Sequence, residues 1–319
     1  MTTTHSGRAD SSIQVARVVA NRSLCREHYR LSFVLTEFPT VRPGQFVHLS
    51  PDPSFRCPYH THEGYPYQPR REWQDIVSAP LLRRAFSVAG VCRDREGITV
   101  DVIYRVVGTA TRWMESLLEN DSLSVLGPLG NGFPISDEKP EAWMVAGGVG
   151  LPPMLFLASA LQERGKQSVA FCGARSADLL ALTIDQSSTD VPRDGTDSLC
   201  CEEFTQFKVS TVISTDDGSL GLHGHVGQAM EAHYSTRRPN PNDVVVYTCG
   251  PERMMRHVAS LCANWDIECY ACMERSMACG TGLCQSCVVG ETLEGGSDEW
   301  RYRLCCTDGP VFDASRICW

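Results

Sequence analysis

The sequence predicts a chain of three parts: an antiparallel β-barrel, a parallel-sheet α/β domain and a small cysteine-rich module. Three observations support this order. Alternating apolar and polar runs dominate the N-terminal part, buried strands then alternate with helices, and a tight cysteine loop follows near the C-terminal end. A length of 319 residues is sufficient for two or three domains.

The barrel is predicted from period-two patterns at residues 13–50, 84–90, 98–106 and 122–127. Only one segment, beginning near Thr111, has apolar residues at helical spacing. About six strands with one helix favour a small closed barrel. Residues 51–80 interrupt the pattern and are rich in Pro, Tyr, His and charge. They contain Cys57, His60 and His62, but these lack a fourth metal ligand, so we expect a solvated insertion.

The second part begins near Glu141 with a buried strand, a glycine turn and an apolar helix from Met154. Three further apolar runs predict strands at 168–173, 207–212 and 244–249. Helical patterns at 228–233 and 252–259 lie before and after the last of them. This alternation predicts βα units around a parallel sheet, with 185–201 as a surface loop.

Composition limits the function. The net charge of −9 argues against a nucleic-acid-binding protein, and no apolar run is long enough to span a membrane. The first ten residues carry no apolar signal segment, so sixteen cysteines are expected in a reducing cytoplasm. Four of them lie in apolar contexts and are expected in the core: Cys25, Cys92, Cys172 and Cys262.

The most informative motif is a cysteine loop with C-x4-C-x2-C spacing. It consists of Cys279, Cys284 and Cys287, and the pair Cys305 and Cys306 follows. Three thiols at this spacing with a fourth downstream are typical of a plant-type [2Fe–2S] cluster. Glycines in the loop allow it to fold around a small cluster and to turn N–H groups toward sulfur. Buried free cysteines and a zinc knuckle remain the alternatives.

Arg84, Phe86 and Ser87 begin a predicted strand, with Arg84 and Phe86 on one face and Ser87 on the other. An arginine, an aromatic ring and a hydroxyl can bind pyrophosphate, stack on a flavin and hydrogen-bond its edge. An amphipathic strand is the alternative. Downstream, Gly108 and Thr111 mark a turn into a helix whose N-terminus suits a phosphate.

A second glycine turn, at Gly147, Gly148 and Gly150, joins a strand to a helix. It favours a dinucleotide phosphate, although it departs from the G-x-G-x-x-G fingerprint. The stretch 215–219, which contains Asp216 and Asp217, follows a strand and could hold ribose hydroxyls with a carboxylate, with a simple turn as the equal alternative. Cys249 and Gly250 close the last strand of this part, where ligands of open α/β sheets gather, so the Cys249 thiol could lie beside a nicotinamide.

In this order the motifs resemble the ferredoxin–NADP reductase superfamily. The resemblance is closer to the electron-transfer subunits of NAD-dependent dihydroorotate dehydrogenase. It rests on strings that begin at Leu81, Gly127, Ala146, Asp217, Cys249, Met277 and Cys306, which together span nearly the whole chain.

The resemblance implies FAD in the barrel, NAD in the middle part and a cluster held by Cys279, Cys284, Cys287 and Cys306. In the family, the fourth cysteine ligand stands directly before the string x-Asp-Gly-Pro. Cys306 has this position, so the resemblance selects Cys306 over Cys305. The implied FAD contacts are Arg84, Ala85, Phe86, Ser87, Ile103, Tyr104, Arg105, Gly108, Ala110 and Thr111. Three features depart from the family: Ala110 replaces a glycine, the 51–80 insertion is long, and Cys269 and Cys272 add thiols near the cluster.

We therefore expect an FAD-binding barrel at 1–138, an NAD-binding domain at 139–267 and a [2Fe–2S] module at 268–319. The family implies a partner: an FMN-containing dihydroorotate dehydrogenase catalytic subunit, in a heterotetramer of two plus two. Electrons would pass from it through the cluster and FAD to NAD+, in pyrimidine biosynthesis. Two alternatives remain. One is the related subunit of an NAD(P)H–ferredoxin oxidoreductase or sulfide dehydrogenase, and the other is a non-catalytic metal-cluster scaffold.

Overall fold

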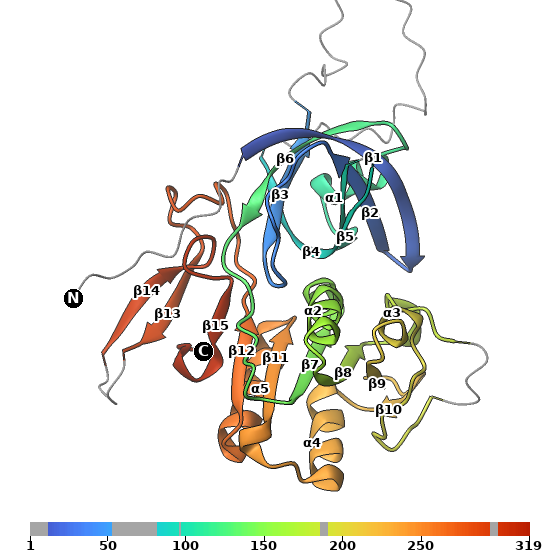
Figure 1. Ribbon diagram of the computed structural model, residues 1–319, viewed down its shortest axis with the longest axis vertical. Coiled ribbons are helices and arrows are strands. Elements are labelled where there is room, and N and C mark those ends of the chain that lie inside the picture. Colours follow the sequence, from blue (N-terminus) through green and yellow to red (C-terminus); the bar gives the residue numbers. More distant parts are fainter. Residues whose placement is uncertain (1–11, 53–81, 96, 186–190, 294–298) are drawn as a thin grey trace, which may run out of the picture.

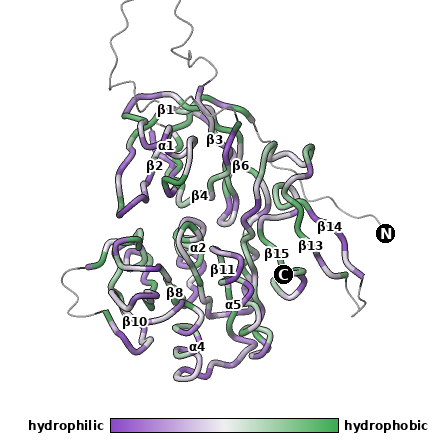
Figure 2. The backbone as a smooth tube through the Cα atoms, turned by 180° about the vertical axis from the view of Figure 1, so that it is seen from behind, coloured by the Kyte–Doolittle hydropathy of each residue, from purple (hydrophilic) through white to green (hydrophobic). Residues whose placement is uncertain are grey.

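The computed structural model describes residues 12–52, 82–95, 97–185, 191–293 and 299–319. The predicted insertion, with Cys57, His60 and His62, lies almost wholly outside these ranges. Two larger bodies lie one above the other, and a smaller module lies beside them (Figure 1). Figure 2 shows the same arrangement from behind, with the β13–β14 hairpin projecting away from both bodies.

Six antiparallel strands form the closed barrel in the order β1-β2-β5-β4-β3-β6. Their bounds are β1 (Ser12–Cys25), β2 (His28–Leu35), β3 (Phe46–Pro51), β4 (Arg84–Arg93), β5 (Ile98–Arg105) and β6 (Ser122–Leu129). Alternate residues of β2 and β5, such as Leu31, Phe33, Val100 and Val102, are fully buried inside it. The period-two prediction of an antiparallel barrel is therefore confirmed.

One short helix, α1 (Thr109–Glu115), closes the barrel. It begins two residues before the predicted start at Thr111. The Thr111 hydroxyl explains the difference, because it accepts hydrogen bonds from the N–H groups of Val107 and Gly108 at 2.9 and 3.1 Å. Thr111 is therefore the third helical residue, whose side chain binds back to the N-terminus.

The second body is a seven-stranded sheet in the order β10-β9-β8-β7-β11-β12-β15. All neighbours are parallel except β12 and β15. The strands are β7 (Glu141–Gly147), β8 (Gln167–Ala174), β9 (Ser210–Thr215), β10 (Leu222–His223), β11 (Val244–Cys249), β12 (Glu268–Cys272) and β15 (Val311–Asp313). The predicted strand at 207–212 begins later, because Phe207 lies in the turn that follows the short helix α3 (Glu202–Thr205).

Helices cover both faces of this sheet. The helix α2 (Leu151–Glu163) packs with α3 on one face, and α4 (Val226–Arg237) packs with α5 (Glu252–Trp265) on the other. Residues of β7 point alternately into these two cores, with Trp143 on the α4–α5 side and Met144 on the α2 side. A sheet buried on both faces explains the continuous apolar runs of its strands.

The cysteine loop and the hairpin of β13 (Val288–Thr292) and β14 (Trp300–Leu304) lie between β12 and β15 in sequence. Both β12 and β15 pair within the large sheet, so the sheet continues past the boundary predicted at residues 267/268. The chain leaves the sheet at β12 and returns antiparallel beside it at β15, and the module is therefore anchored at both ends.

Two of the four cysteines expected in the core lie elsewhere. Cys172 and Cys262 are buried, whereas Cys25 is half-buried at the end of β1 and Cys92 is exposed. Cys92 occupies the outward-facing end of β4, where strand alternation turns it away from the barrel. No helix in the described parts of the chain is long and apolar enough to cross a membrane.

Candidate cofactor and nucleotide sites

The cysteine loop directs backbone N–H groups toward a sulfur atom. The N–H groups of Thr281 and Cys284 each lie 3.4 Å from the Cys279 Sγ. Gly280 and Gly282 make this turn possible, since their φ angles are 73° and 85°. Such N–H groups stabilise a thiolate, the form in which cysteine binds iron.

These hydrogen bonds affect the acidity of the loop thiols. The N–H donors, that of Cys284 foremost, lower the pKa of Cys279 to about 6. A hydrogen bond with Ser286, whose Oγ lies 3.2 Å from the Cys284 Sγ, lowers the pKa of Cys284. Both thiols are therefore prepared to act as anionic ligands.

The other two predicted ligands are buried beneath the loop. Cys287 and Cys306 are 1% and 2% exposed, and the N–H of Cys306 lies 3.4 Å from the Cys287 Sγ. Burial raises the pKa of Cys306 to about 12, and its thiol also interacts with Cys287 and Cys279. The four thiols thus lie at one loop. The outer pair, Cys279 and Cys284, has lowered pKa values, and the inner pair, Cys287 and Cys306, is shielded from water.

Cys305 is oriented differently. Its thiol donates a hydrogen bond to the Met273 carbonyl at 3.2 Å, and burial raises its pKa. This orientation favours Cys306 as the fourth ligand. The additional thiols Cys269 and Cys272 belong to β12 and are buried in the two cores of the sheet.

The spacing of the four cysteines along the chain matches a [2Fe–2S] cluster, in which two irons share four thiolates. In the described part of the chain, no three His, Cys, Asp or Glu side chains meet closely enough to hold a single metal. A structural zinc site needs four ligands around one centre, whereas a [2Fe–2S] cluster distributes four thiolates over two irons.

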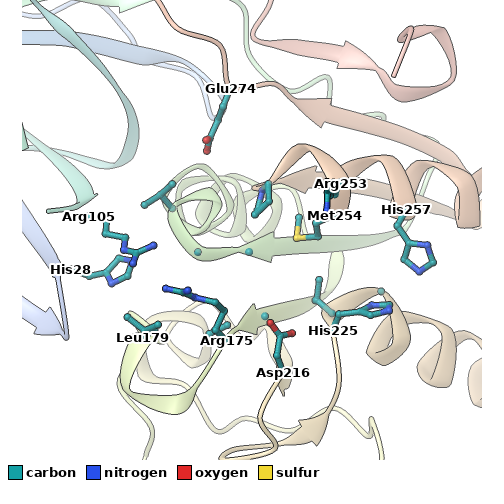
Figure 3. A pocket seen from close by; sticks show the side chains of 18 residues that line it. His28, Arg105, Arg175, Leu179, Asp216, His225, Arg253, Met254, His257 and Glu274 are labelled. Carbon is teal, nitrogen blue, oxygen red and sulfur yellow. The ribbon is translucent and has the colours of Figure 1, made fainter. Parts of the chain in front are cut away.

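A cavity of about 560 Å³ opens along the carboxyl ends of the parallel strands and reaches the barrel (Figure 3). Gly147 and Gly148 lie in its floor, where β7 turns into α2. A Cβ placed on Gly148 would meet no atom within 4 Å, so the backbone is open to a ligand there. The helix N-terminus and the exposed glycine backbone suit a dinucleotide phosphate.

Charged side chains of both signs line this cavity. Three arginines, Arg105, Arg175 and Arg253, line it together with two carboxylates, Asp216 and Glu274. Figure 3 shows Glu274 reaching into the cavity from the wall opposite Arg175 and Asp216. The surrounding walls remove water from the Glu274 carboxyl and raise its pKa, although the carboxyl still faces the open cavity.

Several predicted nucleotide residues lie beside the cavity instead of lining it. Gly150 packs below the floor, where a Cβ would overlap the Cys249 carbonyl. Asp217 accepts hydrogen bonds from Ser219 N and Oγ at 3.0 and 2.6 Å, and the neighbouring Asp216 lines the cavity. The predicted turn around Asp217 is therefore present, with its carboxylate inside the turn.

The Cys249 thiol is directed away from the cavity. It is fully buried in the core on the α2 side, and a hydrogen bond with Cys272 together with burial raises its pKa. The cavity wall after Gly250 is formed by Pro251. The expectation that this thiol lies beside a nicotinamide is thus not supported by its orientation.

On the barrel side, three aromatic rings cluster at the predicted flavin strands. Tyr104 stacks with Tyr29 at 5.7 Å between centroids and meets Phe86 edge to face at 6.2 Å. Ser87 is half-buried beside Phe86, and Ile103 is buried in the core next to Tyr104. Gly108 leaves open space at its Cβ position, and Ala110 is accommodated in the first turn of α1.

The two predicted arginines of this region differ in their partners. Arg84 is exposed and donates to the nearby carbonyls of Leu82 and Arg83, so its guanidinium lies at the surface. Arg105 donates from Nε and Nη2 to Glu27 at 2.8 and 2.6 Å and lines the nucleotide cavity. Ala85 packs on the side of β4 that faces the sheet core.

Sequence reasoning missed several cavity residues, including His28, Arg175, Arg253 and Glu274, whereas Asp216 belongs to the motif it proposed for the ribose. A signal for Arg175 was present, since it lies just beyond the strand predicted at 168–173 and parallel strands end at one edge. His28 and Glu274 carried no such signal, because only the packing of barrel against sheet brings them to the cavity.

Comparisons with known proteins agree with this geometry. Residues 274–318 match the iron–sulfur cluster binding domain of dihydroorotate dehydrogenase B, and residues 144–260 match the oxidoreductase NAD-binding domain. Relatives named dihydroorotate dehydrogenase B (NAD(+)), electron transfer subunit, occur in Desulforamulus reducens and Geobacillus kaustophilus. They are 30% and 31% identical, over 97% and 98% of this chain and 99% and 98% of their own lengths.

The chain belongs to this family of electron transfer subunits. It is an oxidoreductase subunit with an iron–sulfur cluster binding domain and an NAD-binding domain. As a member of the family it acts in electron transfer together with a catalytic partner.

Solved structures support the fold. The NADH-dependent reduced ferredoxin–NADP oxidoreductase aligns with a TM-score of 0.71 at 22% identity, covering 95% of this chain and 90% of that one. Phthalate dioxygenase reductase aligns with a TM-score of 0.52 at 15% identity, covering 92% and 77%. The predicted ferredoxin-reductase-like architecture is therefore confirmed.

Proposed function

We propose that this chain passes electrons from an FMN-containing dihydroorotate dehydrogenase catalytic subunit to NAD+, through a [2Fe–2S] cluster and FAD. One observation carries the proposal: the cysteine loop and the nucleotide cavity lie against the same barrel. A Cβ on Gly280 of the loop would lie 2.8 Å from the ring of His48 in β3, which pairs with Ala85 of β4. Arg105 at the end of β5 lines the cavity.

FAD between the two sites supplies the needed chemistry, since flavins exchange hydrides with nicotinamides and single electrons with clusters. The fit rests on residues of the barrel. Phe86 offers aromatic surface and is backed by the buried ring of Tyr104, Ser87 offers a hydroxyl, and the open backbone at Gly108 admits a phosphate before α1. Arg84, Ala85, Ile103, Arg105, Ala110 and Thr111 complete the proposed contacts.

The cavity binds NAD+. Gly147 and Gly148 face the pyrophosphate, and Gly150 allows the close packing of helix and strand below it. Asp216 is the better candidate for a ribose hydroxyl than Asp217, because Asp217 is already bound to Ser219. Cys249 and Gly250 shape the wall without contacting the nucleotide through the thiol.

The cluster is held by Cys279, Cys284, Cys287 and Cys306. The N–H groups of Thr281 and Cys284 stabilise the negative charge on sulfur, and burial of Cys287 and Cys306 excludes water from one side. The other side is open, because Cys284 and the adjacent Leu283 are exposed, Leu283 by 85%.

This open side suits the partner subunit, since electron transfer requires close approach to the cluster. Exposed Trp300 and Tyr302 on β14 add aromatic surface to the same module. We place two copies of this chain and two catalytic subunits in a heterotetramer. The division into 1–138, 139–267 and 268–319 describes the three cofactor-binding parts, with β12 and β15 shared between the last two.

The proposed location is the cytoplasm. Every cysteine in the described ranges is a free thiol, as expected in a reducing compartment. The pathway served is de novo pyrimidine synthesis, in which dihydroorotate is oxidised to orotate. The two alternatives, a subunit of an NAD(P)H–ferredoxin oxidoreductase or sulfide dehydrogenase and a non-catalytic scaffold, are less favoured by the family matches.

The function is tested by co-expressing the chain with an FMN-containing dihydroorotate dehydrogenase catalytic subunit and assaying orotate formation with NAD+. Cys279→Ser is expected to leave reduction of the flavin by NADH largely intact while stopping electron transfer between the partner and the flavin, and therefore orotate formation with NAD+. Cys92→Ser, at an exposed cysteine of the barrel, is the matched control and retains both. Loss of both activities in Cys279→Ser, or a purified protein without flavin absorbance, contradicts the relay.

A further inference from the structure

Glu274 lines the nucleotide cavity, and its carboxyl has no partner among the described residues. Its side chain makes no hydrogen bond or ion pair with any residue the structure describes, whereas the adjacent Arg275 is paired with Glu252 at 2.9 Å. The residue is exposed toward the cavity, so its carboxylate is available to a ligand that carries positive charge.

The position of Glu274 identifies which part of a dinucleotide it faces. The cavity crosses the sheet edge from Asp216 after β9, past Gly147 after β7, to Pro251 after β11 and Glu274 after β12. If the pyrophosphate of a dinucleotide binds at the glycine turn, one half of the dinucleotide extends over β8 and β9 and the other half extends over β11 and β12.

The flavin-binding strand defines the nicotinamide side. The stretch Arg84–Ser87 pairs with β3, and β3 contacts the cysteine loop through His48 and Gly280. That loop directly follows β12, so the barrel strand proposed for the flavin lies toward the β12 end of the sheet. Hydride transfer requires the nicotinamide to meet the flavin, and the nicotinamide half consequently extends toward Pro251 and Glu274.

The two redox forms of the nucleotide differ in charge at this end. The oxidised nicotinamide ring is a cation, and it becomes neutral when it accepts a hydride. A carboxylate beside the ring attracts the oxidised form and has no comparable attraction for the reduced one.

We propose that Glu274 is a specificity-determining residue that favours NAD+ over NADH by pairing its carboxylate with the cationic nicotinamide ring. The inference rests on the proposed function, because it needs the nucleotide to bind in this cavity. A site with this preference holds the electron acceptor and releases the reduced product.

Binding to the oxidised holo-subunit tests the proposal by calorimetry with three probes. NAD+ carries the cationic ring, 1,4,5,6-tetrahydro-NAD carries a neutral ring that cannot transfer a hydride, and ADP-ribose carries no ring. Glu274→Gln is expected to weaken NAD+ binding roughly tenfold, the order for loss of a charge-assisted contact. Binding of ADP-ribose and of the neutral analogue is expected to change by less than about twofold.

Two variants serve as controls. Glu274→Asp keeps the charge and is expected to retain the preference for NAD+. Asp216→Asn makes the same chemical change at the adenosine end, and it is expected to weaken all three probes to the same extent. Flavin and cluster absorbance establish that each variant is loaded.

Equal weakening of all three probes in Glu274→Gln, or no change in any, overturns the proposal while leaving the nucleotide site intact. Loss of the preference in Glu274→Asp as severe as in Glu274→Gln also overturns it. Failure of the wild-type subunit to bind NAD+ and ADP-ribose contradicts the proposed function itself. The two failures are therefore distinguishable.

Discussion

Gly280 of the cysteine loop lies directly against His48 of the barrel. A Cβ built on Gly280 would come within 2.8 Å of the His48 Cε1 atom and 3.0 Å of the Leu129 Cδ1 atom. Its φ angle of 73° lies in the left-handed region that favours glycine. The contact joins a loop at the end of the chain to a strand near its beginning, and it sets how closely the cluster approaches the barrel.

We expect Gly280→Ala to lower the free energy of unfolding by about 1–3 kcal/mol and to reduce the cluster content, because the new methyl group cannot avoid His48. Denaturant unfolding and the iron content of the purified protein measure the two effects. Gly165→Ala is the matched control, since Gly165 has a similar φ of 68° but open space at its Cβ position. Equal loss of cluster in both variants would show that the contact with His48 is unimportant.

The adjacent cysteines Cys305 and Cys306 are expected to respond differently to serine. Cys306→Ser should remove nearly all cluster absorbance, because its sulfur belongs to the group around Cys287. Cys305→Ser should retain the cluster and lose only about 1 kcal/mol of stability, since serine can still donate to the Met273 carbonyl. Visible absorbance and electron paramagnetic resonance of the reduced proteins decide between them, and the reverse pattern would assign Cys305 as the ligand.

The aspartates after β9 provide a third test. Asp216→Asn is expected to weaken NAD+ binding roughly tenfold, because the carboxylate faces the cavity. Asp217→Asn is expected to have less than about a threefold effect, since Asp217 stabilises the turn at Ser219. Fluorescence or calorimetric titration with NAD+ measures both. A larger loss in Asp217→Asn would return the ribose contact to the residue predicted from the sequence.

His233 is expected to make stability dependent on pH. The residue is 3% exposed between Trp143 and Phe171, and burial lowers its pKa below the ordinary value of 6.5. As the pH falls below about 6.5, the unfolded chain binds a proton that the folded chain does not, so the free energy of unfolding decreases. Above that pH the histidine is neutral in both the folded and the unfolded chain, so this loss of stability is absent.

We expect His233→Phe to flatten this decline in denaturant unfolding between about pH 7 and pH 5. His223→Gln, at an exposed histidine, should keep the wild-type slope. An unchanged slope in His233→Phe would mean that other groups control acid stability.

The sequence by itself determined the architecture and the cluster. Alternation of period two in the first part, continuous apolar strands in the second and the spacing of Cys279, Cys284 and Cys287 are local properties, and each depends on the geometry of a strand, a sheet or a loop. The strings shared with the family added the order of the cofactors.

Only the tertiary structure decided which side chains meet. The cavity combines Arg105 from the barrel, Asp216 from one side of the sheet and Glu274 from the segment that leads to the cluster. These three residues lie far apart in the sequence, and no periodic pattern predicts that they meet. Packing also determines whether a neighbouring side chain, such as that of Asp217 or Cys249, points toward the ligand or away from it. Spacing alone leaves the adjacent thiols of Cys305 and Cys306 equivalent. The resemblance to the family favours Cys306, and the structure adds a physical reason, because the Cys305 thiol donates to the Met273 carbonyl.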